Sequence, residues 1–138
     1  MSGQHMWPET LDIMGWTVDP GGFGVIFDRA IPPFAEERMV PAVNGILRRA
    51  GLELNDVDRL ACHPGGSKVV EALERAFALP DGTLDHERTV LADYGNMSAP
   101  TAFFVLERLM RAGLPRRTLL TALGPGFTVS CVSLKKAA

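Results

Sequence analysis

Short apolar runs bounded by turn residues alternate along this chain with stretches of helical periodicity, and this alternation restricts the possible folds most. The runs at 13–18 and 23–27, separated by the turn residues Asp-Pro-Gly-Gly, predict a β-hairpin. Further strands are predicted at 59–63, 118–123 and 127–134. Helices are predicted at 34–49, 67–79, 86–92 and 98–111. Strands that alternate with helices predict a layered α/β domain.

The turn and cap residues set the expected ends of these elements. Pro32 and Pro33 are expected to end the second apolar run before the first helix begins. Ser67 is the expected cap of the helix at 67–79, and a glycine and a proline end the helix at 98–111. The hairpin follows almost directly after Trp7, with no earlier element to cover its edge. We therefore expect the chain to be part of a larger fold.

Size and charge narrow the classes of function. The chain has 138 residues, enough for one domain, and a formal net charge of −2, which gives no electrostatic reason to expect nucleic acid as a partner. No apolar run approaches the ~20 residues that cross a bilayer, and the first residues lack the pattern of a secretory signal. Two cysteines cannot build a disulfide framework. We expect a cytoplasmic protein that acts on small molecules or proteins.

A histidine lies where the predicted strand at 59–63 ends. His63 is followed by Pro64, Gly65 and Gly66, and in α/β folds such strand ends face the crevice that holds ligands. The glycines allow backbone to approach a ligand closely and leave the next helix start open. A neutral imidazole here could donate a hydrogen bond to a carbonyl oxygen or carry a proton. A purely structural histidine at a strand end is equally compatible with this spacing.

An asparagine precedes the helix predicted at 98–111. Asn96 follows Tyr94-Gly95 and precedes Met97-Ser98, so its side chain could cap that helix. The alternative is functional, because an amide donor does not titrate and suits an oxyanion hole. Donors from His63 and Asn96 aimed at one carbonyl oxygen would stabilise an enolate or a tetrahedral oxyanion.

The remaining candidates are weaker by themselves. Residues 124–126 (Gly-Pro-Gly) predict a rigid turn between two strands. Cys62 adjoins His63, but neighbours on a strand point to opposite faces, so the two cannot form a nucleophile and base pair. Cys62 and Cys131 are expected in the core. The sequence has no serine nucleophile elbow, phosphate loop, Cys-x-x-Cys or His-Glu-x-x-His pattern, and we expect neither a nucleophile nor a metal site in it.

Together, the segments 63–66, 94–98 and 124–126 resemble the C-terminal half of type III polyketide synthases, the chalcone and stilbene synthase family. The resemblance extends from around Trp7 over nearly the whole chain, so residues 1–138 are expected to form one such domain. It implies a thiolase-like half, with a layered mixed sheet and helices on both faces. Each motif alone is a weak signal, but the order and spacing of the three motifs make the resemblance specific.

The resemblance also implies an activity and a site. In the family, a cysteine of the N-terminal half carries the acyl chain, while a histidine and an asparagine of the C-terminal half support decarboxylation of malonyl-CoA and Claisen condensation. These two roles fall on His63 and Asn96. The family implies homodimers, acyl-CoA and malonyl-CoA as substrates, and no organic or metal cofactor. The expected substrate cavity is made of residues Val25, Gly124, Pro125, Gly126 and Phe127.

Two departures from the family pattern qualify these expectations. The half with the nucleophilic cysteine is absent, so this chain alone is expected to be an inactive part of an acyltransferase and to self-associate through its uncovered apolar surface. Plant chalcone synthases have a gating phenylalanine where Val25 stands, near Phe23 and Phe27. Together with the segment 12–16 this favours the bacterial enzymes that make alkylresorcinols or alkylpyrones from fatty acyl-CoA.

Two alternative functions remain open. One is half of an initiating ketoacyl-acyl-carrier-protein synthase, which also pairs a histidine with an asparagine on this fold, although residues 64–66 favour the polyketide family. The other is a non-catalytic binding or assembly module, which the missing nucleophile would suit.

Overall fold

Strands and helices alternate in the computed structural model, which describes residues 1–137. The elements, in chain order, are β1 (Ser2–Met6), β2 (Met14–Asp19), β3 (Gly22–Phe27), α1 (Ile31–Arg49), the short 3-10 helix η1 (Leu54–Asp56), β4 (Arg59–Cys62), α2 (Ser67–Ala76), α3 (Asp85–Tyr94), α4 (Thr101–Arg111), β5 (Arg117–Gly124) and β6 (Thr128–Lys135).

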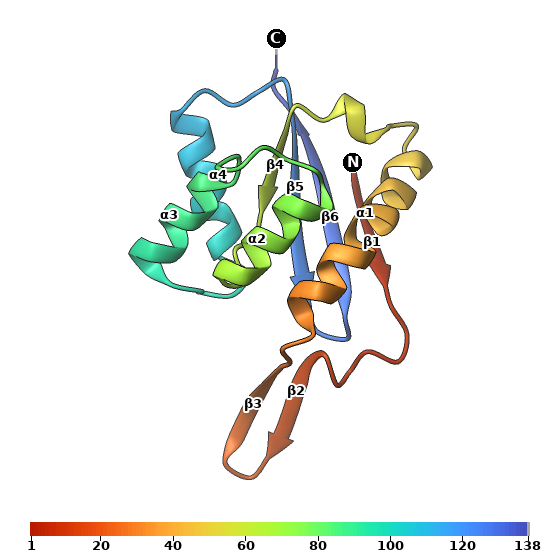
Figure 1. Ribbon diagram of the computed structural model, residues 1–138, viewed down its shortest axis with the longest axis vertical. Coiled ribbons are helices and arrows are strands. Elements are labelled where there is room, and N and C mark those ends of the chain that lie inside the picture. The colour runs from red at the N-terminus through yellow and green to blue at the C-terminus, as the bar shows by residue number, and fades with distance from the viewer. Residues whose placement is uncertain (138) are drawn as a thin grey trace.

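A four-stranded sheet with the order β1-β6-β5-β4 forms the centre of the structure (Figure 1). β4 and β5 are parallel, with Cys62 opposite Thr121, whereas β6 is antiparallel to both β5 and β1. Because β4 and β5 run the same way, the residues that follow them emerge at the same edge of the sheet. That edge carries His63 and the turn after Gly124.

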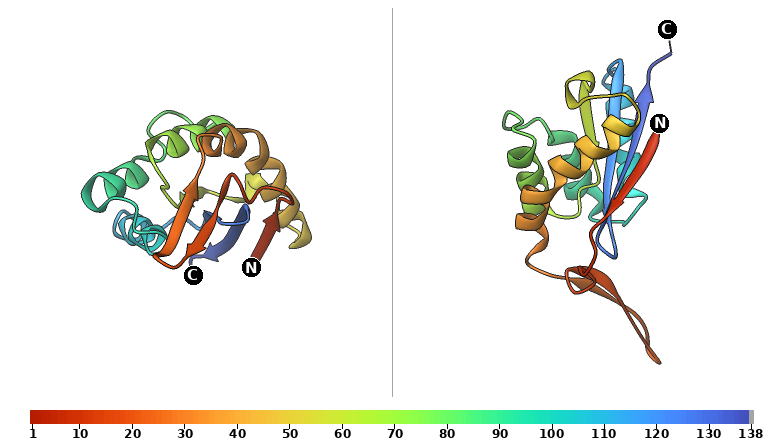
Figure 2. Two further views of the ribbon diagram at one scale, coloured as in Figure 1. Left: turned by 90° about the horizontal axis from the view of Figure 1, so that it is seen from below. Right: turned by 90° about the vertical axis from the view of Figure 1, so that its right-hand side faces the viewer.

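Helices cover both faces of this mixed sheet, as the resemblance implied. α1 and α2 pack on one face, where Val43, Leu73 and Leu119 belong to the larger apolar core (Figures 1 and 2). On the other face, Val105 and Leu109 of α4 pack with Ala61 of β4. α3 lies beside β4 at the edge of the sheet, where Val90 joins the second cluster.

The β2–β3 hairpin projects from the body of the domain (Figures 1 and 2). Two backbone hydrogen bonds hold its base: Asp28 N donates to Ile13 O at 3.0 Å, and Gly126 N donates to Met14 O at 2.8 Å. Residues directly opposite each other in an antiparallel pair share a face. The pairs Trp16–Val25 and Val18–Phe23 therefore make one face of the hairpin apolar, and all four side chains are exposed.

A strand that the sequence did not predict precedes the hairpin, although it joins the main sheet and does not cover an edge of the hairpin. β1 pairs with β6, with Gly3 opposite Cys131, and so covers the edge of the main sheet. The first residues carry no apolar alternation, so their sequence gives no strand signal. Their pairing depends on backbone groups and on close packing, since a β-carbon on Gly3 would lie only 2.6 Å from Ile46 Cγ2.

Several element ends also differ from the sequence expectations. α1 begins at Ile31 and includes Pro32 and Pro33, which is allowed because the first helical residues need no N–H partner. Gly66, not Ser67, is the N-cap of α2. α4 begins only at Thr101.

Across residues 1–137, none of the helices combines the length and the apolar character that crossing a membrane requires.

Candidate active site

His63 is the first residue after β4, and the backbone around it is firmly held. Its N–H donates to Thr121 O at 2.8 Å, which extends the pairing with β5, and its carbonyl oxygen accepts from Gly65 N at 3.1 Å. Pro64 is buried between these two points. The imidazole is therefore attached to a fixed strand end rather than to a mobile loop.

The His63 imidazole is partly buried, and burial lowers its pKa below the ordinary value of 6.5. It is therefore neutral at pH 7. Its Nδ1 atom is buried without a hydrogen-bond partner among the described residues. A proton is better placed on the accessible Nε2, because a buried N–H without an acceptor is costly. The imidazole can then donate one hydrogen bond from Nε2.

Asn96 lies directly beyond α3, after Gly95 has turned the chain with a φ of 70°. Its Nδ2 donates to Gly65 O at 3.1 Å, and its Oδ1 accepts from Ser98 N at 2.8 Å. The second bond closes a local turn ahead of Thr101, so Asn96 is not the N-cap of α4, which is Pro100. Only one of the two Nδ2 hydrogens is used by Gly65.

Gly65 brings the two predicted donors together. A β-carbon built on Gly65 would lie 4.0 Å from His63 Nε2, and the carbonyl oxygen of the same residue accepts from Asn96 Nδ2. The amide of Asn96, which is far from His63 in sequence, is therefore bonded to the loop that directly follows His63. The side chains of His63 and Asn96 thus belong to two loops that are joined at Gly65.

The predicted cavity residues lie at three places: the end of β5 with the turn after it, the core, and the hairpin. Gly124 ends β5 and Pro125 and Gly126 begin the turn after it, at the same sheet edge as His63, and Gly126 has a φ of 89°. Phe127 is instead fully buried, with its ring 5.6 Å from that of Trp7 and 5.0 Å from that of Phe34. Its side chain is a core residue and contributes no accessible surface.

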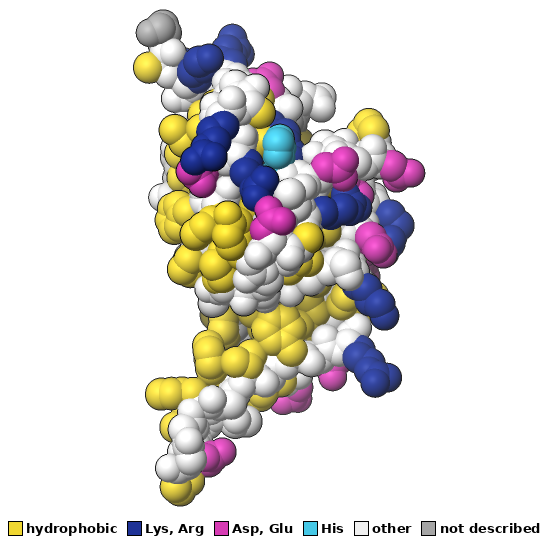
Figure 3. Space-filling model, turned by 90° about the vertical axis from the view of Figure 1, so that its left-hand side faces the viewer, with side chains coloured by type: hydrophobic (Ala, Val, Ile, Leu, Met, Phe, Trp, Pro, Cys, Tyr) yellow, Lys and Arg dark blue, Asp and Glu magenta, His cyan; other side chains and the backbone are white. Residues whose placement is uncertain are grey.

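Val25 lies on the exposed apolar face of the hairpin, 53% exposed. Figure 3 shows apolar side chains gathered along this projecting segment. The exposed large apolar side chains of the hairpin are Trp16, Val18, Phe23, Val25 and Phe27.

An open groove of about 550 Å³ lies between the end of β3 and the start of α2. The lining residues are Phe27, Asp28, Arg29, Ile31, Pro32, Gly65, Gly66, Ser67, Lys68 and Val69. The two glycines are those predicted to permit close approach of a ligand, whereas Arg29 and Lys68 are not among the residues predicted for the site. Their position in the sequence could have indicated a role, because both are cationic residues next to a strand or helix end.

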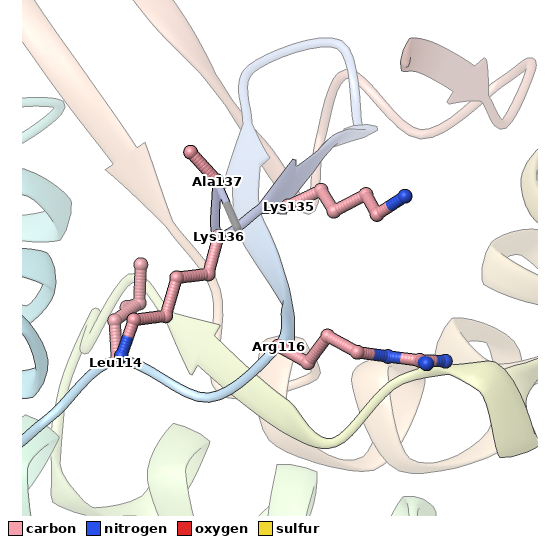
Figure 4. A pocket seen from close by; sticks show the side chains of 5 residues that line it. All are labelled: Leu114, Arg116, Lys135, Lys136 and Ala137. Carbon is pink, nitrogen blue, oxygen red and sulfur yellow. The ribbon is translucent and has the colours of Figure 1, made fainter.

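A larger open depression of about 750 Å³ lies at the opposite end of the strands, beside the start of β5 and the end of β6. Figure 4 shows Lys136 extending toward Leu114, whereas Lys135 and Arg116 extend the other way. The three cations do not converge on one point. This depression holds neither of the predicted donors.

The two cysteines are buried and face the core. Burial, together with the negative charge of the nearby Glu87 carboxylate, raises the pKa of Cys62 to about 12, and burial raises that of Cys131 to about 11. Thr121 Oγ1 donates to Cys62 Sγ at 3.3 Å. Both thiols stay protonated at neutral pH, and neither is a candidate nucleophile. Residues 1–137 also contain no group of three or more His, Cys, Asp or Glu side chains arranged to hold a metal ion.

Comparison with known proteins supports one family. The family model for chalcone and stilbene synthases, C-terminal domain, matches residues 1–138. The 1,3,6,8-tetrahydroxynaphthalene synthase of Streptomyces peucetius subsp. caesius is 35% identical over 134 residues, which cover 95% of this chain and 36% of that enzyme. A putative chalcone synthase of Bacillus subtilis (strain 168) is 35% identical over 120 residues, covering 85% of this chain and 33% of that protein. The chain thus spans about a third of the length of these relatives.

Solved structures agree with the sequence relatives. The crystal structure of 1,3,6,8-tetrahydroxynaphthalene synthase from Streptomyces coelicolor A3(2) superposes with a TM-score of 0.87 at 25% identity, covering 100% of this chain and 40% of that one. CsyB complexed with CoA-SH shares the fold with a TM-score of 0.88 at 23% identity, covering 99% of this chain and 39% of that one. The chain therefore belongs to the chalcone and stilbene synthase family of type III polyketide synthases and has the thiolase-like fold of their C-terminal domain.

Proposed function

We propose that this domain provides the two oxyanion donors of a polyketide synthase that extends an acyl-CoA starter with malonyl-CoA. His63 and Asn96 would hold the thioester oxygen of the malonyl group. The observation that carries the proposal is the hydrogen bond of Asn96 Nδ2 to Gly65 O at 3.1 Å, which ties Asn96 to the loop after His63, where a β-carbon built on Gly65 would lie 4.0 Å from His63 Nε2.

The chemistry requires stabilisation of one developing negative charge. When the malonyl carboxylate leaves as CO₂, the electron pair of the broken C–C bond forms an enolate, with its charge on the thioester oxygen. A neutral His63 donating from Nε2 and the second Nδ2 hydrogen of Asn96 suit that oxygen. The enolate carbon then attacks the starter thioester and displaces its thiolate, or takes a proton to give acetyl-CoA. Removing one such donor typically costs ~3 kcal/mol of barrier.

The groove beside Gly65 and Gly66 supports a CoA thioester as the substrate. Glycines let an extended pantetheine arm pass close to the backbone. Arg29 and Lys68, which also line the groove, supply positive charge for the CoA phosphates. CsyB, which shares the fold, was solved with CoA-SH.

The starter and the cavity belong to the same proposal. We assign Val25 and the turn Gly124-Pro125-Gly126 to the substrate cavity, because the hairpin and this turn are joined at Met14. The apolar hairpin face suits the alkyl chain of a fatty acyl starter and an alkylresorcinol or alkylpyrone product. Phe127 would support this wall from the core rather than touch the substrate.

The nucleophile would come from an N-terminal half of the same protein, in a soluble, cytoplasmic homodimer without a metal or organic cofactor. The raised pKa values of both Cys62 and Cys131 support a nucleophile from another half, since neither thiol provides a thiolate at neutral pH. This chain alone would bind substrate weakly and would not condense acyl chains.

Two measurements test the proposal. In the isolated chain, malonyl-CoA is titrated while the His63 ring and Asn96 side-chain amide resonances are followed by NMR, and both should shift. In a joined protein, in which this chain follows a cysteine-bearing N-terminal half, malonyl-CoA decarboxylation and condensation with acyl-CoA are assayed. Here His63→Ala and Asn96→Ala should each lower kcat ~10²–10³-fold.

The matched controls are His86→Ala and Asn55→Ala, which remove the same side-chain types outside the groove and should leave kcat unchanged. A preference for malonyl-carrier protein over malonyl-CoA would favour the ketoacyl synthase alternative. Absence of substrate-dependent shifts at both donors, together with absence of turnover, would leave only a binding or assembly module.

A further inference from the structure

The outer side of β4 is closed by a side-chain ion pair rather than by another strand. β4 is at the end of the sheet order, so the polar groups of Leu60 and Cys62 that point away from β5 have no neighbouring strand. Glu87 Oε1 accepts from Cys62 N at 3.0 Å, and the Arg59 guanidinium donates to Leu60 O. Arg59 Nη2 and Glu87 Oε2 lie 2.9 Å apart. The pair therefore replaces the missing strand over the last residues of β4.

This ion pair is buried. The Glu87 side chain is 0% exposed and that of Arg59 is 11% exposed. Burial raises the pKa of Glu87, although the Arg59 charge and the Cys62 N–H act in the opposite direction. A buried carboxylate is tolerated only when its partners are well placed. Burying this pair therefore costs free energy of folding. The pair contacts Cys62, which immediately precedes His63.

Glu87 also connects the two elements that carry the donors. It belongs to α3, whose end leads directly to Asn96, while its partner Cys62 directly precedes His63. A second contact joins the loops that follow these two elements, where Asn96 Nδ2 donates to Gly65 O. α3 is therefore attached to the end of β4 near the start of the helix, and the loop after α3 is attached to the loop after β4.

We infer that Glu87, held by Arg59, is a positioning residue that fixes α3 against the end of β4 and so sets the relative placement of His63 and Asn96. The inference rests on the proposed function for its catalytic meaning. Glu87 itself touches no substrate, because it is fully buried beside the outer edge of β4.

The test uses Glu87→Gln, which keeps the size of the side chain but presents an N–H group to Arg59 or to Cys62 N–H. In the isolated chain, the Asn96 side-chain amide should exchange with water faster than in the unchanged chain while the protein stays folded. In the joined protein, kcat for malonyl-CoA decarboxylation should fall ~10–100-fold with KM within about twofold of the original. A loss of stability alone would not produce this split at a temperature where the variant is folded.

Glu74→Gln is the matched control. Glu74 is a second buried carboxylate that forms an ion pair with an arginine, Arg88. This pair joins α3 to α2 rather than to β4. It should destabilise the fold without changing Asn96 exchange or kcat. Should Glu87→Gln fail to fold, Arg59→Gln tests the same pair from the other side with the same expected changes.

The possible results separate the two proposals. Equal effects of Glu87→Gln and Glu74→Gln on Asn96 exchange and on kcat would overturn the positioning role. If the joined protein shows no turnover and the His63 and Asn96 resonances do not shift when malonyl-CoA is added, the proposed function fails. In that case the amide-exchange comparison still decides whether Glu87 positions Asn96.

Discussion

The side-chain amide of Asn96 donates to the backbone carbonyl of Gly65 at 3.1 Å and so joins the loop after α3 to the loop after β4. The contact links residues 31 positions apart and ties a neutral donor to the loop that follows His63. It also occupies only one of the two amide hydrogens. The same side chain can therefore fix the loop and remain a donor toward a substrate.

Asn96→Asp tests both uses of this amide. The change keeps the acceptor for Ser98 N but places a carboxylate oxygen against Gly65 O, so the loop contact becomes repulsive. It also puts a negative charge where the enolate charge would develop. We expect kcat of the joined protein to fall at least as far as in Asn96→Ala, by ~10²–10³-fold. Equal kcat values for Asn96→Asp and the unchanged protein would contradict the assigned role.

The stability of the chain should fall in mild acid because of His63. Burial lowers the folded-state pKa of this side chain below 6.5, so the folded protein binds its proton less readily than the unfolded chain. The resulting stabilisation is fully present above pH 6.5 and is lost as the pH falls from 6.5 through the folded-state pKa. Urea unfolding between pH 7.5 and pH 5 measures this slope.

His63→Gln should reduce the slope of stability against pH in that window, whereas His86→Gln serves as the control for losing a histidine elsewhere. A slope in His63→Gln as steep as that of the unchanged chain would assign the acid sensitivity to other groups.

Phe127→Ala should destabilise the fold strongly, although sequence similarity placed this residue at the cavity. The side chain is 0% exposed and packs on Trp7 and Phe34. Truncating a buried phenylalanine typically costs about 3–5 kcal/mol. Val25→Ala, on the exposed hairpin face, should change the free energy of unfolding by no more than about 0.5 kcal/mol. Chemical denaturation of both variants compares them, and a small loss for Phe127→Ala would be incompatible with its core position.

The isolated chain should self-associate through the apolar hairpin face. Val18 and Phe23 lie opposite each other there and are 72% and 76% exposed. An apolar surface of this kind marks an interaction site. Light scattering at tens of micromolar, roughly the range of weak interfaces, should detect species larger than one chain. The double change Val18→Ser and Phe23→Ser should shift the equilibrium toward monomer, while Met110→Ser on α4 should not. A monomer at that concentration would rule out this association.

Features encoded locally were predictable. The hairpin was recognised because the turn residues 19–22 separate two apolar runs, and β2 and β3 fall within one residue of those runs. The apolar stripe of 67–79 gave α2, although the helix ends at Ala76 because Ala78 has a φ of 49°. His63 was placed at a strand end because the Pro-Gly-Gly that follows cannot continue a strand.

Features that depend on distant contacts were not predictable. β1 was missed because its stability comes from backbone pairing with β6, and Gln4 and Ser130 are 126 positions apart. The sequence of α3 likewise makes Glu87 look like one more charged residue of a polar helix, since nothing local indicates that Arg59 and Cys62 N–H meet it.

The amino-acid sequence alone determined the periodicities, the turns and the two donor types, because these follow from side-chain chemistry and near neighbours. The placement of Asn96 on Gly65, the burial of Glu87 and the core position of Phe127 required the tertiary structure. Each of these depends on which surfaces meet when the sheet and helices pack, and that meeting is a property of the whole chain rather than of any segment.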